Sequence, residues 1–381
     1  MAGSILEHEL SELRLLVERQ TGILLDCPNS VLANHAAEYL ESQELDSSSA
    51  LLGLLRSSEK DPTVMQRFLD GVLNVNTSFF RHPGAMNALT KQVFPQLHAR
   101  KSGDGSATLR IWSAGCSTGE EAYSIAMALC NPQPPASVSN GSGANGYGGN
   151  GNGKVKDKSS KEKSPARNGG IADTVSPDTP SVKDLCVHII GSDLLPSAIE
   201  VAERGLYPQS ALAGLPPAII RACFSKIGSA NGAASPQNNT QELDQDESAV
   251  GSDVQNNGLN GNSNRMYSNS NAQANGSSNG AHLLVKPRLR SLVTFNTMNL
   301  TKPVYIGRFD CIFCMDVLPH LSRAQRTALL ERLHLYLEPG GYLFLSQTEK
   351  LSAPNLNFRS ETFDGYTFHR KPLAASAAYG R

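Results

Sequence analysis

Two adjacent carboxylates follow a run of small residues, and their types and spacing suit a ligand site. Residues 113–119 read Ser-Ala-Gly-Cys-Ser-Thr-Gly, and Glu120 and Glu121 come directly after them. Small side chains let the backbone approach a ligand closely, as at Gly115. The carboxylates would repel a phosphate but suit a ligand that carries hydroxyl groups and positive charge. They equally fit helix N-terminal acids favoured by the macrodipole, so the pattern alone leaves both interpretations open.

The residues on either side predict the elements that position this run. Leu109, Ile111 and Trp112 suit a buried strand, and apolar residues recur at helical spacing from Glu120 to Leu129. A strand, a small-residue turn and a helix open the ligand crevice of a doubly wound α/β sheet. The stretch has neither Gly-x-Gly-x-x-Gly nor Gly-Lys-Ser/Thr spacing, which disfavours dinucleotides and nucleoside triphosphates.

A third acid ends the next predicted strand. The apolar run 185–190 leads to Asp193. An acid at this place in a doubly wound sheet binds ribose hydroxyls. Asp193 also suits a cap for the helix that begins near Pro196, and the two roles are compatible.

An arginine lies beside two aromatic residues at the start of the sheet part. Residues 74–81 read Asn-Val-Asn-Thr-Ser-Phe-Phe-Arg. The guanidinium of Arg81 would suit a carboxylate in a cleft at this junction, although most arginines lie on the surface. Phe79 and Phe80 most simply anchor the connection.

Composition excludes several classes of function. The 381 residues carry a net charge of −1, so no global field attracts nucleic acid or an anionic membrane. The sequence has no run of 18 apolar residues and no secretory signal, which predicts a soluble, cytoplasmic protein without membrane insertion. Seven scattered cysteines indicate reduced thiols. Cys311 and Cys314 lie in an apolar run without a second pair, so we expect buried strand residues and no metal site.

The chain divides by pattern into a helical part and a sheet part. We expect an N-terminal helical domain over 1–73, a sheet domain over 74–372 and a tail over 373–381. Two Asn/Gly/Ser-rich inserts, at about 131–183 and 228–280, cannot bury enough apolar surface to build a core. Further elements are predicted in the sheet domain: helices over 84–96 and 322–336, and strands over 292–295, 309–314, 342–345 and 366–368.

Six motifs together resemble a known family. They are Thr77-Ser78-Phe79-Phe80-Arg81, Trp112-Ser113-Ala114-Gly115-Cys116-Ser117-Thr118-Gly119-Glu120-Glu121, Ser192-Asp193, Asn299-Leu300, Phe309-Asp310-Cys311-Ile312-Phe313-Cys314 and Pro339-Gly340-Gly341. Their order and spacing resemble the CheR family, the S-adenosylmethionine-dependent protein-glutamate methyltransferases that modify bacterial chemotaxis receptors. The resemblance spans nearly the whole chain once the inserts are removed.

The resemblance implies a class I S-adenosylmethionine-dependent methyltransferase sheet with an N-terminal all-helical domain. It implies S-adenosyl-L-methionine as cofactor and a methyl-accepting chemoreceptor or other signalling protein as partner, and we expect a monomer. The implied cofactor-binding residues are Thr77, Arg81, Gly115, Glu121, Asp193, Asn299, Leu300, Met315 and Asp316. Arg81 is also placed by the resemblance near the acceptor carboxylate.

The sequence departs from the family pattern near the cofactor and the acceptor. Val75 stands where members usually carry Asn, and Met315-Asp316 stands where they carry Arg-Asn. His320 takes the place of a tyrosine, and residues 346–349, Ser-Gln-Thr-Glu, replace Gly-His-Ser-Glu. Arg81 and His320 are the catalytic candidates, and His320 would bind the acceptor; a loop histidine without a role fits equally well.

Two other functions compete with methyl transfer to the glutamate carboxylates of a signalling protein, which would give glutamyl methyl esters. The first is an N-methyltransferase that acts on nucleic acid or on protein amides. Such enzymes usually carry an Asn/Asp-Pro-Pro-aromatic loop after the central strand, and residues 315–319, Met-Asp-Val-Leu-Pro, disfavour this function. A catalytically degenerate domain that binds S-adenosylmethionine or a partner is the alternative that Met315-Asp316 keeps open.

Overall fold

The computed structural model describes residues 5–57, 61–73, 77–103, 108–130, 185–226, 281–303, 306–351 and 355–373. Both predicted inserts lie outside the described residues, as do Val75 and most of the C-terminal tail.

Four helices form the N-terminal part over the described residues 5–57 and 61–73. They are α1 (Glu7–Thr21), α2 (Asn29–Ser42), α3 (Ser48–Ser57) and α4 (Pro62–Asp70). Gly22 ends α1 in the left-handed conformation, and the Asp61 side chain caps α4 by accepting from the Thr63 N–H. Their apolar faces share one core, which also includes Leu195 and Ala198 at the start of helix α8 (Pro196–Arg204). The helical part therefore packs directly on the sheet part.

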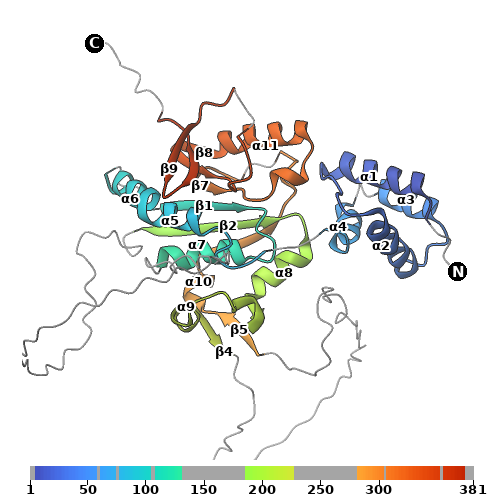
Figure 1. Ribbon diagram of the computed structural model, residues 1–381, viewed down its shortest axis with the longest axis horizontal. Helices are drawn as coiled ribbons and strands as arrows, with labels where there is room; N and C mark the ends of the chain where they lie inside the picture. The colour runs from blue at the N-terminus through green and yellow to red at the C-terminus, as the bar shows by residue number, and fades with distance from the viewer. Residues whose placement is uncertain are drawn as a thin grey trace, which may run out of the picture.

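A seven-stranded sheet forms the centre of the molecule, in the order β6-β2-β1-β7-β8-β10-β9 (Figure 1). Its strands are β1 (Thr108–Ala114), β2 (Cys186–Asp193), β6 (Val293–Thr297), β7 (Phe309–Phe313), β8 (Leu337–Phe344), β9 (Arg359–Phe363) and β10 (Tyr366–Arg370). The first five in spatial order are parallel, and β10 and β9 complete the sheet as an antiparallel pair. From β1 the chain adds β2 and β6 on one side, and it then adds β7 and β8 on the other side of β1. This change of side is the mark of a doubly wound sheet, so the predicted doubly wound class I methyltransferase sheet is confirmed.

Helices cover both faces of the sheet. On one face, α5 (Pro83–Ala88), the π-helical turn Leu89–Val93, α6 (Phe94–Gly103), α7 (Glu120–Cys130) and α10 (Pro287–Arg290) contribute to a continuous core. On the other, α11 (Arg323–Tyr336) packs against Trp112 and Ile312 of the sheet. Helix α8 (Pro196–Arg204) lies between the sheet and the N-terminal helices, as Figure 1 shows.

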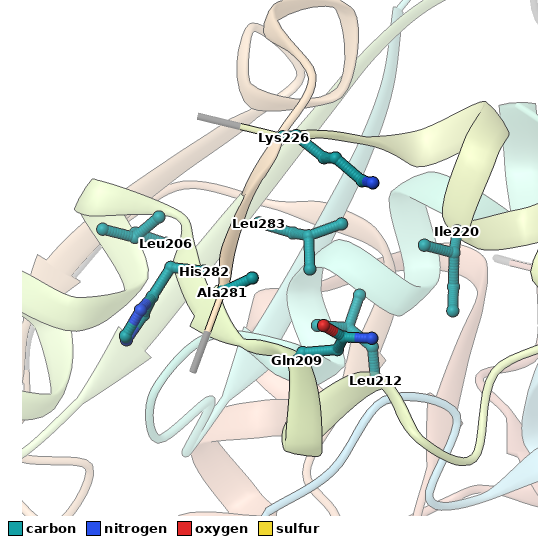
Figure 2. A pocket seen from close by; sticks show the side chains of 8 residues that line it. All are labelled: Leu206, Gln209, Leu212, Ile220, Lys226, Ala281, His282 and Leu283. Atoms are coloured by element: carbon teal, nitrogen blue, oxygen red, sulfur yellow. The ribbon is translucent and has the colours of Figure 1, made fainter. Parts of the chain in front are cut away.

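A second, three-stranded sheet has the order β3-β5-β4, built from β3 (Leu206–Pro208), β4 (Phe224–Lys226) and β5 (His282–Val285). The 3-10 turn Gln209–Leu212 and α9 (Pro217–Cys223) accompany it. A cavity of about 560 Å³ opens beside it, lined by Leu212, Ile220 and Leu283 among others, with Lys226 and His282 also at its wall (Figure 2). None of the predicted site residues lines this cavity.

The sequence patterns missed several of these elements. Strands of three or four residues are too short to show a period of two, so the small sheet escaped detection. Strand β9 was missed as well, and the helix expected over 84–96 is longer and contains the π-helical turn. In the described residues, no helix is long and apolar enough to cross a membrane.

Candidate active site

The candidate site lies where parallel strands end beside one another. Strand β1 ends at Ala114 and pairs with β2, which ends at Asp193, and with β7, which ends at Phe313. The turn after β1 is held to β2, because the N–H groups of Gly115 and Cys116 both donate to the Ser192 carbonyl, at 2.8 and 2.9 Å. The small-residue run is therefore fixed against the neighbouring strand.

Asp193 holds this turn with its carboxylate. One oxygen accepts from the Ser117 N–H at 2.9 Å, and the other accepts from the Leu195 N–H at 3.1 Å. Burial raises the pKa of Asp193, and these backbone hydrogen bonds oppose the rise. Leu195, rather than Asp193, occupies the N-cap position of α8. The Asp193 carboxylate therefore links the β1–α7 turn to the segment that leads from β2 into α8.

The two adjacent carboxylates of the small-residue run have different surroundings. Glu120 is buried and accepts from the Thr118 hydroxyl at 2.6 Å. Glu121 accepts from the Ser113 hydroxyl at 2.6 Å. Burial raises the pKa of Glu121 to about 7, and the charges of Asp316 and Glu349 add to the rise. The Ser113 hydrogen bond and the Arg81 charge oppose it.

Arg81 lies beside a carboxylate of this chain. Its Nε is 3.1 Å from Asp316 Oδ2, and His82 Nε2 is 2.8 Å from the same oxygen. Asp316 lies in the segment after β7 and has a positive φ of 59°. Two residues separated by more than 200 positions, Arg81 and Asp316, therefore meet at one place.

Sequence reasoning did not place three of the groups that surround this pair. His82 was not singled out, and Glu349 was noted only within a substituted motif. Glu349 accepts from the N–H groups of Leu318 and Ser346, at 2.9 and 2.8 Å. Burial raises the pKa of Tyr366, at the start of β10, and the charges of Glu121, Glu349 and Asp316 add to the rise. No local pattern marks a tyrosine of an edge hairpin as part of such a cluster.

Other predicted residues lie around this centre with their polar groups engaged. The Asn299 amide donates to the Thr21 carbonyl at 3.2 Å, and its oxygen accepts from the Thr301 N–H at 2.9 Å. The Leu300 carbonyl accepts from Arg332 at 2.6 Å. Asn299 thus joins the helical part to the sheet part, whereas Leu300 is held by α11 within the sheet part.

The remaining three predicted residues differ in burial. Met315 is buried in the core on the α7 face of the sheet, and Thr77 is half-buried. His320 is exposed, and its carbonyl accepts from the Leu24 N–H at 2.8 Å. The structure therefore places the backbone of His320 against the segment after α1.

The turn after β1 fits a cofactor with polar groups. Gly115 has a φ of 86°, and a Cβ at this position would lie 2.5 Å from Val317. The buried Ser117 hydroxyl has no hydrogen-bond partner in the part of the chain that the structure describes. This hydroxyl belongs to the same residue whose N–H donates to the Asp193 carboxylate, and a hydroxyl and a carboxylate together suit a ligand with ribose hydroxyls.

Comparison with known proteins decides the family. A model described as "CheR methyltransferase, SAM binding domain" matches residues 75–139 and 238–366, which is half of the chain. The chain belongs to the CheR family. S-Adenosyl-L-methionine is the cofactor of this domain, and the turn after β1, with Glu121 and Asp193, offers polar groups for it.

Relatives in the CheR family match along most of the chain. Chemotaxis protein methyltransferase 1 of Pseudomonas aeruginosa is 24% identical over 342 residues, which cover 89% of each chain. Chemotaxis protein methyltransferase 1 of Vibrio cholerae is 22% identical over 355 residues, which cover 92% of each. Among solved structures, a magnesium protoporphyrin IX methyltransferase from Synechocystis is similar at 11% identity over 84% of this chain and 93% of its own, with a TM-score of 0.26.

Proposed function

We propose that this protein transfers the methyl group of S-adenosyl-L-methionine to glutamate side chains of a chemoreceptor or related signalling protein, giving glutamyl methyl esters. The observation that carries the proposal is the ion pair between Arg81 and Asp316. A guanidinium at the end of the parallel strands already holds a carboxylate there, at 3.1 Å, and an acceptor glutamate presents the same group.

The proposed reaction needs no general base. A glutamate side chain, with an ordinary pKa of about 4.3, is an anion at neutral pH. When bound, S-adenosylmethionine supplies the methyl group on a positively charged sulfur. The acceptor oxygen bonds to the methyl carbon while the carbon–sulfur bond breaks, and opposite charges are neutralised without a proton transfer. The protein's part is to align the acceptor and to remove its water.

Arg81 and its neighbours supply that alignment in the proposal. Phe79 packs edge-on against Tyr207 and Phe224, with ring centroids 4.9 and 5.4 Å apart. The Phe80 N–H donates to the Ser124 hydroxyl of α7 at 2.9 Å. The segment that carries Arg81 is therefore anchored to both the small sheet and α7, which supports a fixed orientation for the guanidinium. His320 stays a candidate for acceptor binding.

The proposal also includes the domain bounds, the localisation, the oligomeric state and the cofactor-binding residues. We place a helical domain at 1–73, the methyltransferase domain at 74–372 and a tail at 373–381, in a cytoplasmic monomer that takes neither nucleic acid nor a metal ion. The residues proposed to contact the cofactor are Thr77, Arg81, Gly115, Glu121, Asp193, Asn299, Leu300, Met315 and Asp316.

A second candidate function does not need an acceptor carboxylate at Arg81. Because Asp316 pairs with the Arg81 guanidinium, an acceptor carboxylate has to share that guanidinium with Asp316 or displace Asp316 from it. A domain that binds S-adenosylmethionine or a partner without turnover is consistent with this arrangement.

Alkali distinguishes the candidates. The protein is incubated with S-adenosylmethionine labelled in the methyl group and with membranes that carry candidate receptors, and the labelled protein is then treated with mild base. Esters release labelled methanol, whereas methylated amines and amides do not. Label that survives the base would rule out the carboxylate acceptor. Cofactor binding without labelling of any acceptor would favour the degenerate domain.

A further inference from the structure

One carboxylate links the segments that follow β7 and β8. Glu349 Oε1 accepts from the Leu318 N–H at 2.9 Å, and its Oε2 accepts from the Ser346 N–H at 2.8 Å. Strands β7 and β8 are parallel neighbours, so both segments leave the sheet at the same edge. Each oxygen of this bridging carboxylate is therefore bound to a different strand end.

The segment that carries Glu349 is itself fixed to the sheet. The Tyr366 hydroxyl of β10 donates to the Leu345 carbonyl at 2.6 Å, and Tyr366 is buried. The Glu349 N–H donates to the Ser346 carbonyl at 3.0 Å, which closes a turn over residues 346–349. Because its own backbone is held in this way, the Glu349 carboxylate can hold the segment after β7 in one position.

The segment after β7 contacts two parts of the candidate site. The Asp316 carboxylate lies 3.1 Å from Arg81 Nε. Val317 packs over the turn after β1 so closely that a Cβ on Gly115 would lie 2.5 Å from Val317 Cγ2. Leu318 is the next residue, is buried, and donates its N–H to the bridging carboxylate. The bridge therefore holds the chain directly beside both contacts.

We propose that Glu349 is a positioning residue, which holds the segment 315–318 against both Arg81 and the turn after β1. The inference rests on the proposed function, because that function assigns Arg81 to the acceptor and the turn to the cofactor. Glu349 acts through the Leu318 N–H and takes no part in the transfer itself. A backbone hydrogen bond to a carboxylate is stronger than one between neutral groups, and a segment that is fixed before the ligands bind does not have to be ordered when they bind.

Glu349→Gln weakens this link without shortening the side chain. Glutamine has one acceptor oxygen, and its NH₂ group cannot accept from the second N–H. We expect faster amide hydrogen exchange at Leu318 or Ser346, a roughly three- to tenfold higher dissociation constant for S-adenosylmethionine by calorimetry, and a roughly tenfold lower kcat. Because kcat is measured at saturating ligand concentrations, its fall reports the alignment of bound ligands. Glu349→Ala removes both acceptors and should have the larger effect on all three.

Glu9→Gln is the matched control. Glu9 is half-buried like Glu349, and its carboxylate also joins two segments, since it accepts from the Leu6 N–H at 2.8 Å and from the Ser48 hydroxyl. These contacts lie within the helical part. We therefore expect Glu9→Gln to lower the melting temperature about as much as Glu349→Gln does, with cofactor affinity and kcat unchanged.

The outcomes separate this inference from the proposed function. If Glu349→Gln melts like Glu9→Gln but keeps the native affinity and kcat, Glu349 has only a stabilising role and the inference is wrong. Unchanged hydrogen exchange at both N–H groups would also contradict it. If the unmodified protein binds S-adenosylmethionine but labels no acceptor, the affinities of the two variants still decide the inference. If the unmodified protein does not bind S-adenosylmethionine, the proposed function fails and the inference falls with it.

Discussion

The Tyr207 hydroxyl of the small sheet donates a 2.7 Å hydrogen bond to the carbonyl of Thr118 in the turn after β1. Tyr207 is buried, and its ring packs against Phe79, two residues before Arg81. One side chain therefore contacts both the turn proposed to hold the cofactor and the segment proposed to hold the acceptor. The small sheet is in this way a support for the active site.

Removing the Tyr207 hydroxyl should loosen the turn after β1. We expect Tyr207→Phe to lower the free energy of unfolding by about 1 kcal/mol, the contribution of a typical hydrogen bond, and to weaken S-adenosylmethionine binding a few-fold. Tyr342→Phe is the control, because Tyr342 donates a 2.6 Å hydrogen bond to Gln96, which is not among the site residues. Thermal melts and calorimetry on both variants should show similar destabilisation but weaker binding only for Tyr207→Phe. Equal cofactor affinities in the two variants would contradict the role of Tyr207.

Loss of the Asp193 carboxylate should weaken cofactor binding strongly. Asp193→Ala removes the proposed charge-assisted bonds to ribose and the acceptor for the Ser117 N–H. We expect a loss of about 1–3 kcal/mol in binding free energy, measured by calorimetry. Asp70→Ala serves as the control, since Asp70 accepts from Ser197 of α8 and not from the turn. Unchanged affinity in Asp193→Ala would place the ribose elsewhere.

Glu121 should make cofactor affinity depend on pH near neutrality. With a pKa of about 7, the carboxyl of Glu121 is largely protonated at pH 6 and largely ionised at pH 8. Its anion is the form that suits the cationic end of the cofactor, so affinity should rise between pH 6 and 8. Calorimetry across this range measures the rise, which Glu121→Gln should abolish. The same slope in Glu121→Gln would assign the titration to another group.

The same group should affect the stability of the cofactor-free protein in the opposite direction. Its pKa is about 4.5 in the unfolded chain and about 7 in the folded one. Between these values the folded protein holds a proton that the unfolded chain has lost. The contribution of Glu121 to the free energy of unfolding therefore falls as pH rises from about 4.5 to 7. Denaturant melts at pH 5 and pH 7 should show this fall in the native protein and a smaller one in Glu121→Gln.

Arg81→Lys should reduce turnover more than cofactor binding. Lysine keeps the charge but cannot align a carboxylate with two parallel hydrogen bonds. A loss of about 1.4 kcal/mol of alignment in the transition state corresponds to a roughly tenfold lower kcat. Arg204→Lys is the matched control, because Arg204 is 71% exposed in α8. A kcat that is unaffected in Arg81→Lys, measured by release of alkali-labile methyl groups, would remove Arg81 from acceptor alignment.

Local patterns were sufficient for much of the fold and for part of the site. Gly22, Asp61 and Ser322 mark helix ends because capping chemistry acts over three or four residues. The strands that end at Ala114 and Asp193 were predicted because buried parallel strands read as continuous apolar runs. The sequence by itself thus determined the doubly wound sheet and the acids at its strand ends.

Only the tertiary structure decided which distant groups meet. Arg81 and Asp316 are joined by sheet closure, and no periodicity in either segment encodes their 3.1 Å contact. Glu349 and Tyr366 come near Glu121 because β8 and β10 pair on the far side of β7. The pKa of Glu121 rises for the same reason, since burial and neighbouring charge are properties of the packed chain. Sequence alone determines side-chain types and local backbone, whereas charge coupling depends on distances that form only when the strands assemble.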